Sequence, residues 1–523
     1  MLTSLRHIAR LIGIARALAK HDAMIVRGVH PLADTMIRVC AVVWRPLPEV
    51  KDLRPGQRLA LALEKLGPAF IKFGQALSTR SDLLGEDVAA DLAELQDRLA
   101  PFPFADAAAT IATDFGKPLE SLFTSFEPTP VAAASIAQVH FAVTTEGADV
   151  AVKVLRPNVA QAFARDIGLL YWLADLALRA RPQLQRLKPR EVVATFENTV
   201  RLEMDFRFEA AAGQEVAENF AGDASFKVPA VDWQRTSGRV LTTERVAGLR
   251  VDDRTGIEAA GLDPIAVVKT AAEAFFHMVF RDGFFHADMH PGNLFVAPVE
   301  GRAGGQGGQI IAMDFGIMGR IDAATQRTLA EMLLGFLTRD YKKVAEVHVA
   351  AGFVPAHKSV DEFAQACRSI AEPILGKPIA QISLARLLGQ LFRVTEQFEM
   401  QTQPQLLLLQ KSMLVAEGVG RTLAPETNMW ELAQPLIEAW MRERLGPEAQ
   451  LADAAQTALT SIAQVPRIIN RLDAVTADMA VHGLKLHPQS AEALRGQGSP
   501  WGRWLPWAVI AVLAITLLVQ AVR

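Results

Sequence analysis

The sequence predicts an α+β fold in which a few β-strands are set among many helices. Two observations support this prediction. The runs "QVHFAV" (138–143) and "DVAVKVL" (149–155), with "TTEGA" between them, have the pattern of a β-hairpin. Long segments on either side carry apolar residues at helical spacing, and half of the 523 residues are hydrophobic. A chain of this length can form about two to four domains with substantial cores.

The net charge bears on the possible partners of the protein, and the cysteine content bears on its redox compartment. The formal net charge is −3 at pH 7 and the isoelectric point is about 6.4, so no nucleic-acid partner is expected. The two cysteines, Cys40 and Cys367, lie far apart in the sequence. They form no disulfide framework and fit a reducing compartment.

The N-terminal region, residues 1–50, is basic and amphipathic. Its stretch "LRHIARLIGIARALAK" (5–20) combines basic residues with leucine and isoleucine at helical spacing. Such a helix can lie on an anionic membrane or dock on the protein's own surface, and the sequence leaves both open. Residues 51–125 are predicted to follow as a helical extension, in which "EDVAADLAELQDRL" (86–99) places its apolar residues on one stripe.

The segment 126–260 is predicted to contain the main strands. The hairpin opens this segment, and helical periodicity follows at 160–220. A further strand is predicted at "GRVLTTERV" (238–246), which is rich in β-branched residues.

The segment 261–445 is predicted to be mainly helical around a small pair of strands. An apolar helix at 265–281 comes first. The strands "NLFVAP" and "QIIAMDF" then flank a glycine-rich loop. From Asp322, a candidate helix cap, nearly every segment has helical periodicity, up to and including a tail and linker at 446–498.

The C-terminal segment, residues 499–523, is predicted to anchor the chain in a membrane. "LPWAVIAVLAITLLVQAV" (505–522) has no charge, and as a helix it is about 27 Å long, close to the roughly 30 Å of a bilayer core. Three tryptophans at its start suit a membrane interface. A buried core helix is the alternative. Residues 1–23 lack the features of a secretory signal, so the bulk of the protein is expected to be cytoplasmic.

The stretch "GFFHADMHPGNLFV" (283–296) begins a set of residues suited to phosphoryl transfer. Asn293 lies five residues after Asp288, and Asp314 lies in "MDFGI" at the end of a predicted strand. Lys153 lies in the middle of a hairpin strand. A carboxylate can orient the nucleophile, an amide and a second carboxylate can bind Mg²⁺, and a lysine can neutralise nucleotide phosphates. Asp288 and Lys153 are therefore candidate catalytic residues, Asn293 and Asp314 candidate metal ligands, and ATP and Mg²⁺ the expected cofactors.

A zinc site is the alternative interpretation of the same stretch, because His286, Asp288 and His290 alternate along it. Zinc sites recruit further His, Cys or Glu ligands, and the sequence has no such cluster nearby. We expect His286 to hydrogen-bond within the loop. We expect "HPG" (290–292) to form a turn that directs Asn293.

The lysine requires a carboxylate partner. "FENTVRLEMDFRFEAA" (196–211) is predicted to be one helix that carries four acidic residues. Among them, Glu197 is our predicted partner of Lys153 and a third candidate catalytic residue. Glu209 is expected to be a solvated surface carboxylate.

The predicted nucleotide-binding loop has alanines where a kinase loop has glycines. In "AAASIAQV" (132–139), the three glycine positions are occupied by Ala132, Ala134 and Ala137. Alanine disfavours positive φ and adds a methyl group where phosphates would pass. The candidate nucleotide-binding residues are Val131, Ala132, Ala133, Ala134, Ser135, Ile136, Ala137, Gln138, Val139 and Lys153.

Two features of protein kinases are missing. Ala287 replaces the arginine of the H-R-D motif. After "DFG" (314–316), only "IMGRI" precedes the helix that Asp322 is expected to cap. The sequence therefore encodes no long activation segment on which a peptide substrate could lie.

Together, the alanine loop, "VAVK", "LEMDF", "HADMHPGN" and "DFG" resemble the UbiB family of atypical kinase-like proteins. Further matches to the family's K-x-G-Q and E-x-D motifs are Lys72, Gly74, Gln75, Glu203 and Asp205. The resemblance covers roughly residues 60–345. Met289 stands where proline is common, and the sequence predicts one membrane span where bacterial members often have two.

The resemblance implies a protein-kinase-like two-lobed fold, with an N-lobe at 126–260 and a C-lobe at 261–445. It implies a helical N-terminal extension over the substrate cleft, whose Lys72 reaches toward Glu203 and Asp205 in a regulatory role. It also implies slow, Mg²⁺-dependent ATP hydrolysis that supports ubiquinone biosynthesis at the inner membrane. The implied partners are membrane lipids, polyprenyl ubiquinone precursors and other enzymes of that biosynthesis. The alternatives are a protein or small-molecule kinase and a pseudokinase scaffold.

Overall fold

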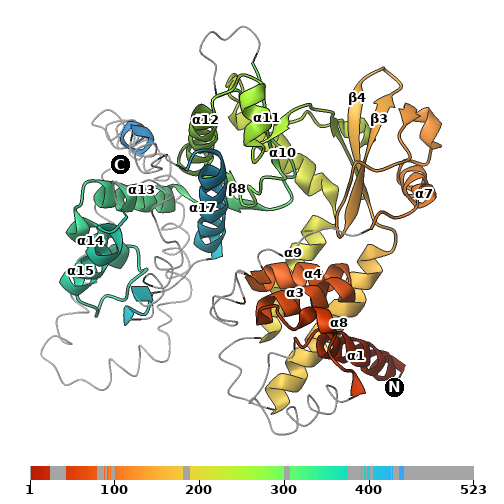
Figure 1. The fold of residues 1–523 in the computed structure, drawn as a ribbon, viewed down its shortest axis with the longest axis horizontal. Coiled ribbons are helices and arrows are strands. Elements are labelled where there is room, and N and C mark those ends of the chain that lie inside the picture. The colour runs from red at the N-terminus through yellow and green to blue at the C-terminus, as the bar shows by residue number, and fades with distance from the viewer. Residues whose placement is uncertain are drawn as a thin grey trace, which may run out of the picture. The chain divides into compact units, whose positions relative to one another are not determined.

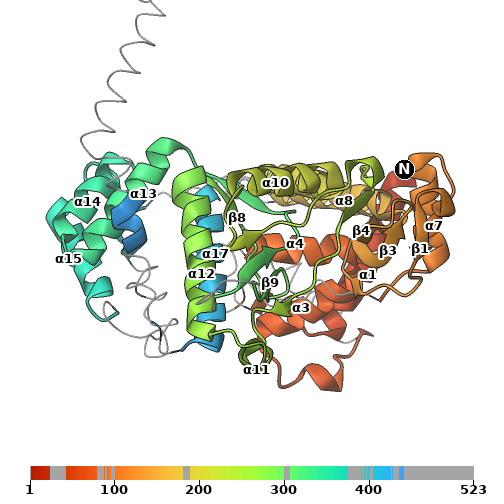
Figure 2. The same ribbon diagram turned by 90° about the horizontal axis from the view of Figure 1, so that it is seen from above.

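The computed structural model divides into two compact units, Met1–Trp440 and Met441–Arg523. It describes residues 2–23, 43–78, 100–180, 189–299, 307–374, 397–400, 404–425 and 435–440, with a few isolated residues between these ranges. The predicted tail and membrane anchor, 446–498 and 499–523, lie outside the described residues. Among the helices of the described ranges, none has the length and hydropathy needed to cross a bilayer. Figures 1 and 2 show the helices and strands of the first unit.

The first sheet contains the predicted hairpin. Its strand order is β1-β3-β4-β6, with β2 paired to β3. The strands are β1 (Phe123–Phe126), β2 (Ala132–Ala133), β3 (Ala137–Thr144), β4 (Asp149–Leu155) and β6 (Val240–Glu244). The predictions of the hairpin and of a strand at 238–246 are confirmed. In the antiparallel register Lys153 of β4 lies opposite Val139 of β3.

One face of this sheet is covered by α7 (Phe104–Phe115), which lies in the segment 51–125 predicted as the N-terminal extension. Ala107 and Ile111 of α7 are completely buried, and they pack with Val152 and Val154 of β4. β1 and the short η2 (Leu119–Ser121) lead from α7 into the sheet. This part of the segment predicted as extension therefore contributes to the core of the N-lobe.

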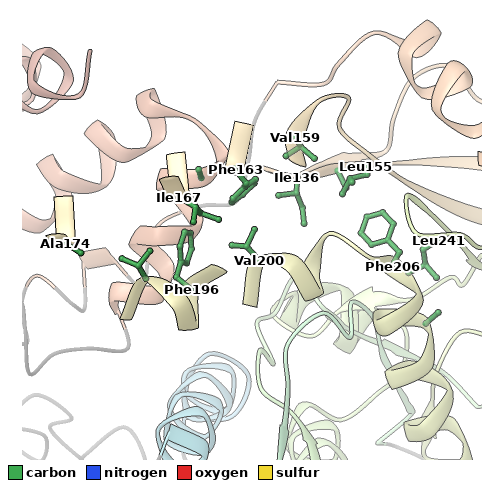
Figure 3. Packing of buried hydrophobic residues seen from close by; sticks show 14 residues of the cluster. Ile136, Leu155, Val159, Phe163, Ile167, Ala174, Phe196, Val200, Phe206 and Leu241 are labelled. Carbon is green, nitrogen blue, oxygen red and sulfur yellow. The ribbon is translucent and has the colours of Figure 1, made fainter. Parts of the chain in front are cut away.

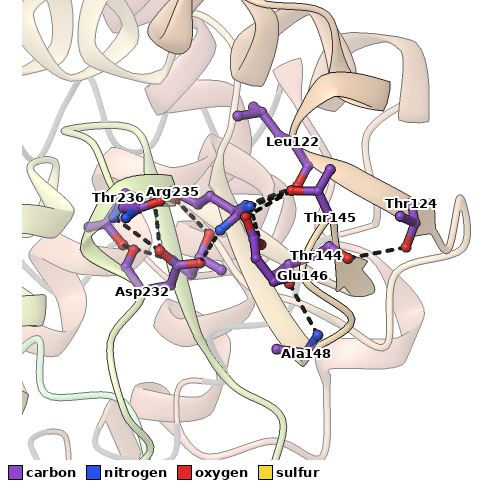
Figure 4. Close-up of polar contacts among 11 residues, drawn as sticks. Leu122, Thr124, Thr144, Thr145, Glu146, Ala148, Asp232, Arg235 and Thr236 are labelled. Carbon is purple, nitrogen blue, oxygen red and sulfur yellow. Dashed lines mark hydrogen bonds and ion pairs between the residues drawn. The ribbon is translucent and has the colours of Figure 1, made fainter.

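A buried arginine binds the tip of the β3–β4 hairpin and the carbonyl of Leu122, just before β1 (Figure 4). Arg235 lies in η4 (Trp233–Arg235) and is 7 % exposed. Its guanidinium donates to the Leu122 carbonyl (2.9 Å) and to the Thr145 hydroxyl (2.8 Å). It also pairs with the carboxylates of Asp232 and Glu146, at 2.8 and 2.5 Å. These contacts satisfy the buried charge and hold residues 144–146 against η4.

Three helices connect β4 to β6: α8 (Val159–Ala180), α9 (Pro189–Glu203) and α10 (Phe206–Asn219). The prediction of one helix over 196–211 is wrong, because the helix is interrupted at residues 204–205, between α9 and α10. The Asp205 carboxylate accepts a hydrogen bond from the Arg207 N–H and caps the start of α10. The interruption places Glu197 and Glu209 on different helices, and only Glu209 of α10 contacts Lys153.

The described helices of the predicted basic region are α1 (Leu2–Lys20) and η1 (Pro48–Val50), and the predicted extension begins with α3 (Pro55–Leu66) and α4 (Pro68–Ser78). α1 docks on the protein itself. Its Arg10 forms an ion pair of 2.8 Å with Asp166 of α8, a residue that is 3 % exposed. The same guanidinium donates to the carbonyl of Leu66, at the end of α3 (2.9 Å). Of the two alternatives for the N-terminal helix, the structure therefore supports docking.

A single hydrophobic cluster joins the extension to the N-lobe (Figure 3). Ala69 of α4 packs in this cluster with Phe163 of α8 and Phe196 of α9. Ile136, between β2 and β3, belongs to the same cluster. Because apolar burial contributes roughly 25 cal/mol per Å², moving the extension away from these helices would be costly.

The second sheet has the order β5-β10-β9-β7, and a separate strand pair joins β11 to β8. These strands are β5 (Phe226–Lys227), β7 (Leu249–Arg250), β8 (Phe284–His286), β9 (Leu294–Ala297), β10 (Gln309–Ala312) and β11 (Met318–Arg320). The two predicted strands after residue 292 are confirmed as β9 and β10, which pair antiparallel. The chain segment between β8 and β9 contains Asp288, and the segment after β10 contains Asp314.

Helices make up most of the remaining described C-lobe. They are α11 (Arg254–Ala259), α12 (Pro264–Phe276), the π-helical turn η5 (His277–Asp282), α13 (Ala323–Leu337), α14 (Tyr341–Ala350), α15 (Val360–Ala371) and α17 (Pro404–Leu423). The predicted helix at 265–281 is confirmed as α12 and η5. Asp322 caps α13 as expected, since its carboxylate accepts from the Thr325 N–H at 2.8 Å.

Candidate functional site

Lys153 lies at the centre of an ion-pair cluster in which the Lys153 and Glu209 side chains are 17 % and 9 % exposed and the Asp314 side chain is 47 % exposed. Its Nζ donates to both carboxylate oxygens of Glu209 (2.8 and 3.0 Å) and to Asp314 Oδ2 (3.1 Å). β4 supplies the lysine, α10 supplies Glu209, and Asp314 follows β10. The structure thus brings together two of the predicted site residues, Lys153 and Asp314.

The predicted pairing of Lys153 with Glu197 is wrong. Glu197 lies on α9, where the neighbouring Phe196 points into the core and packs edge-on against Phe73, with ring centroids 5.3 Å apart. Glu197 therefore faces outward, and it accepts a hydrogen bond from the Tyr171 hydroxyl (2.7 Å). The expectation that Glu209 is a solvated surface residue is also wrong, because its side chain is only 9 % exposed.

The lysine and its two carboxylates perturb one another's ionisation. Burial alone would lower the pKa of Lys153, but the charges of Asp314 and Glu209 outweigh burial and raise that pKa. Burial raises the pKa of Glu209 to about 7, and Lys153 offsets only part of this effect. For Asp314, burial opposes ionisation, yet Lys153 and, to a smaller extent, Lys72 lower the pKa to about 2. Asp314 is therefore ionised at neutral pH.

The backbone at Asp314 is held in an unusual conformation. Its φ is +58°, in the left-handed region that few non-glycine residues adopt. Its Oδ1 accepts from the Gly316 N–H (3.2 Å), and the preceding Met313 N–H donates to the Asn293 carbonyl (2.8 Å). Strained residues of this kind concentrate at functional sites, where surrounding contacts hold them in place. Here those contacts fix the direction of the Asp314 carboxylate.

Phe315 packs against His286, at the end of β8, and against α10. Its ring lies 5.4 Å from the His286 ring. On the other side it approaches Gly213 of α10, where an added Cβ would lie 3.1 Å from the Phe315 ring. The absence of a side chain at Gly213 thus lets α10, which carries Glu209, lie close to Asp314. Sequence analysis did not single out Gly213.

The segment 288–293 forms a tight turn that joins Asp288 to Asn293. The Asn293 side-chain amide donates to the Asp288 carbonyl (3.1 Å), and the Asn293 N–H donates to the His290 carbonyl (2.8 Å). The predicted turn that directs Asn293 is confirmed. Because the amide nitrogen is used in this bond, the side-chain oxygen is the atom that Asn293 can offer to a cation.

His286 stabilises this turn and does not have the geometry of a metal ligand. It is completely buried, and its Nδ1 accepts from the Asp288 N–H (3.1 Å). Nε2 therefore carries the proton and donates to the Met313 carbonyl (3.2 Å). Burial lowers the pKa of His286, so the ring is neutral. The expectation that His286 hydrogen-bonds within the loop is confirmed. The described ranges contain no group of three or more His, Cys, Asp or Glu suited to a metal.

Mg²⁺ shared with a nucleotide fits the residues that are present. Magnesium prefers hard oxygen ligands and is commonly held by one or two carboxylates together with substrate phosphates. The ionised Asp314 carboxylate and the Asn293 side-chain oxygen are ligands of this kind. Lys153 would then face the phosphates that share the metal.

One C-lobe helix, α17, also supports the segment that contains Asp288. Ser412 of α17 is completely buried, and its hydroxyl lies 3.3 Å from the His286 carbonyl and 3.0 Å from the Leu408 carbonyl. Ala287, which replaces the usual arginine, is also completely buried, and its N–H donates to the Ile317 carbonyl (3.0 Å). Helical periodicity alone could not identify Ser412.

The N-terminal extension reaches the edge of the site through Lys72. Lys72 and Glu203 form an ion pair of 3.0 Å, in which the two side chains are 13 % and 10 % exposed. The implied contact with Glu203 is therefore present. Asp205 instead caps α10 and pairs with Arg207 (2.6 Å). The influence of Lys72 on the pKa of Asp314 indicates that its charge lies near the site.

The other two residues of the K-x-G-Q motif hold α4 in place. A Cβ on Gly74 would lie 2.6 Å from Leu63, so glycine permits α3 and α4 to approach closely. The Gln75 side chain donates to the Leu95 carbonyl (3.3 Å). These contacts position the helix that carries Lys72.

The alanine loop is a tight hairpin with a buried tip. Ala132 and Ala133 pair with Val139 and Gln138, and the Ala134 N–H donates to the Ala137 carbonyl (2.7 Å). Residues 131–139 are all described, and none of them has a positive φ. Ser135 and Ile136 at the tip are buried. The loop therefore uses backbone conformations that alanine adopts readily, and it does not need the freedom of glycine.

These features define the class of the protein. A strand lysine paired with a helix glutamate, a loop with Asp288 and Asn293, and an aspartate before Phe315-Gly316 constitute a kinase-like site. Only β11 and a short connection separate that motif from α13, so the structure has no activation segment at this place. The class is an atypical kinase-like protein.

Comparison with known proteins identifies the family. Residues 94–348 match the model of the ABC1 atypical kinase-like domain, and residues 367–428 match that of the UbiB helical domain. "Probable protein kinase UbiB" of Marinobacter nauticus is 45% identical over 404 residues, which are 77% of this chain and 73% of the relative. The protein of the same name from Pseudomonas aeruginosa is 41% identical over 513 residues, 97% and 93% of the two chains. The chain belongs to the UbiB family of atypical kinase-like proteins.

A solved structure was also found, that of the Rv3197–erythromycin complex from Mycobacterium tuberculosis. It is 24% identical, with a TM-score of 0.47, and the match covers 74% of this chain and 94% of that one.

Proposed function

We propose that the protein hydrolyses ATP with Mg²⁺ at the site around Lys153, and that this activity supports ubiquinone biosynthesis at the inner membrane. The observation that carries the proposal is the position of Lys153, within hydrogen-bonding distance of both Glu209 and Asp314. In phosphoryl-transfer enzymes, this arrangement holds the nucleotide phosphates beside the metal-binding aspartate.

Each residue has a distinct role in the proposed reaction. Lys153 binds the phosphates, and Glu209 holds Lys153 in position. Asp314 and Asn293 provide oxygen ligands for Mg²⁺, which neutralises charge on the phosphates. Asp288 orients a water molecule. The water oxygen attacks the γ-phosphorus, the bond between that phosphorus and the β–γ bridging oxygen breaks, ADP leaves, and the water proton passes to Asp288 or to solvent.

Two features favour water over a protein as the phosphoryl acceptor. Between Gly316 and α13 there are only β11 and a short connection, so no activation segment is present there to bind a peptide. In addition, the extension that carries Lys72 packs through Ala69 into the N-lobe core. A protein or small-molecule kinase is the alternative, and the names of the relatives agree with a protein kinase. A scaffold without activity would not require Lys153, Asp288, Asn293 and Asp314 together.

The proposed partners are inner-membrane lipids, polyprenyl precursors of ubiquinone and other enzymes of ubiquinone biosynthesis. This part of the proposal rests on the family and on the apolar segment 505–522. That segment, as a helix of about 27 Å, would anchor the protein next to such lipids.

The test is an assay of the purified full-length protein with Mg²⁺ and ATP labelled at the γ-phosphate, with and without phospholipid vesicles that contain a polyprenyl phenol. We expect labelled inorganic phosphate to be released, at a rate that rises with the vesicles, and no label on protein. Transfer of label to a protein or to a small molecule would support the kinase alternative. The absence of both release and transfer would support the scaffold.

A further inference from the structure

Arg156, the residue that follows β4, holds both carbonyl groups at the tip of the alanine loop. Its Nε and Nη2 donate to the Ala134 carbonyl at 3.1 and 2.9 Å. Its backbone N–H donates to the Ile136 carbonyl (2.7 Å). Hydrogen bonds from a charged donor are stronger than neutral ones, so the side-chain contact strongly restricts the Ala134 carbonyl.

The same guanidinium reaches the segment 100–102, which precedes α7. Nη2 of Arg156 donates to the Ala100 carbonyl (2.8 Å), and the guanidinium lies over the Phe102 ring, 5.4 Å from its centroid. The planar fork of arginine can bind two carbonyl groups and stack on an aromatic ring at once. Arg156 therefore joins the loop to residues 100–102.

A second connection between the same two segments comes from Gln138. The Phe102 N–H donates to Gln138 Oε1 (3.0 Å), and Gln138 Nε2 donates to the Phe102 carbonyl (3.3 Å). The orientation of this buried amide is fixed by His140. His140 Nδ1 donates to the Glu127 carbonyl (2.8 Å), so its Nε2 can accept from Gln138 (2.9 Å).

Hydrophobic packing fixes the tip of the loop from a third direction. Ile136 is 7 % exposed and lies in the cluster with Ala69 of α4 and with Val159 and Phe163 of α8 (Figure 3). α4 also carries Lys72, three residues after Ala69. The alanine loop cannot move away from this position without losing the packing of Ile136 and the hydrogen bonds to Arg156.

We propose that Arg156 is a positioning residue of the nucleotide site, which ties the alanine loop to residues 100–102 and keeps it from closing over the terminal phosphate of ATP. The inference rests on the proposed function, because it concerns how the same site distinguishes ATP from ADP. A glycine-rich kinase loop covers the phosphates. Here the Arg156 guanidinium binds the Ala134 carbonyl, so the loop could close over the γ-phosphate only by breaking those hydrogen bonds.

The experiment compares the full-length protein with the variants Arg156→Ala and Arg156→Lys, and with Arg165→Ala as the matched control. Arg165 lies on α8, its side chain is 60 % exposed, and its nearest carboxylate, Asp166, is 3.6 Å away. Two quantities are measured: amide hydrogen exchange in residues 131–139 without nucleotide, and the dissociation constants of ATP and ADP with Mg²⁺.

In Arg156→Ala we expect the Ala134 amide to exchange at least about tenfold faster, because the loop loses both hydrogen bonds that the guanidinium donates to the Ala134 carbonyl. We expect the ratio of ATP to ADP affinity to rise several-fold. Arg156→Lys should recover part of both effects, because lysine can reach one carbonyl but cannot bind two and stack. Arg165→Ala should leave both quantities within about twofold of the wild type.

If exchange and affinity ratio in Arg156→Ala match those of Arg165→Ala, the inference is wrong. If exchange rises but the ratio does not, Arg156 is only structural, and the inference is again wrong. In both cases wild-type binding of ATP would leave the proposed function intact. If the wild type binds neither nucleotide, the proposed function fails, and this inference fails with it.

Discussion

The pairing of Lys153 with Glu209 leads to a prediction that separates the structure from the sequence-based choice. Glu209→Gln should greatly slow ATP turnover, whereas Glu197→Gln should have almost no effect. Both variants change one α-helical glutamate, on α10 and α9, into an isosteric neutral residue. They differ in their contacts, because Glu209 binds Lys153 and Glu197 accepts from Tyr171.

The magnitude follows from the two bonds that Glu209 makes to Nζ, at 2.8 and 3.0 Å. Glutamine keeps one acceptor oxygen and places an NH₂ donor against the lysine in place of the other. The loss of one hydrogen bond to a charged group is worth about 1.5–3 kcal/mol. The hydrogen bond from Lys153 to Asp314 (3.1 Å) remains in the variant, so we expect no larger loss of free energy than this. If the loss is expressed in the transition state, kcat/KM falls about 10- to 150-fold.

The assay is steady-state phosphate release at pH 8, where Glu209 is ionised, with thermal melts of each variant to establish that it is folded. Glu197→Gln should stay within about twofold of the wild type, since changes at exposed residues have small effects. A folded Glu209→Gln protein with wild-type kcat/KM would refute the assigned pairing. A large loss of kcat/KM in Glu197→Gln alone would support the pairing of Lys153 with Glu197.

Three further predictions concern the metal, the pH dependence and the tail. Asp314→Asn should weaken Mg²⁺-dependent nucleotide binding, and unchanged Mg²⁺ dependence in a thermal-shift titration would argue against metal ligation. The pKa of Glu209 is raised from 4.5 to about 7 in the folded state, so folding takes up a proton between these values and stability falls as pH rises through them. In urea unfolding, the free energy of unfolding should therefore decrease by roughly 3 kcal/mol at most as the pH rises through this interval. This decrease should be absent in Glu209→Gln, and identical pH profiles of the two proteins would contradict the prediction. Removing residues 499–523 should release much of the protein from membranes with its cooperative melt preserved, whereas loss of the melt would show that the segment belongs to a core.

Local sequence patterns correctly predicted the β3–β4 hairpin and the turn that follows Asp288. The β3–β4 hairpin follows from two apolar runs around a turn, and its register then places Lys153 on the sheet. The turn after Asp288 follows from His290, Pro291 and Gly292, whose backbone preferences are strong. In these cases neighbouring residues alone determine the geometry.

The partner of Lys153 could not be predicted in the same way, because it depends on the break between α9 and α10. A signal was nevertheless present. Phe206, Glu209, Ala210, Gly213 and Val216 form the buried stripe of α10. A glutamate in such a stripe requires a charged partner, since an unpaired buried charge is strongly disfavoured. The capping residue Asp205 likewise indicated that a new helix begins there.

Other parts of the site depend on contacts between segments distant in sequence. Ser412 meets His286 across 126 residues, and Arg156 meets Ala100 across 56. Neither contact follows from periodicity or from a motif. The close approach of α10 to Phe315 depends on Gly213, whose role appears only when the packing is known.

The most direct test of the proposed hydrolysis is the Asp288→Asn variant, measured for ATP binding and for phosphate release in the same preparation. Asparagine can occupy the same space, and the turn contacts made by the Asp288 backbone do not require its carboxylate. Lys153, Asn293 and Asp314 should still bind Mg²⁺ and ATP with near wild-type affinity. Loss of a positioned base should lower turnover about 10²- to 10⁴-fold. A wild-type rate of phosphate release from Asp288→Asn would contradict the account.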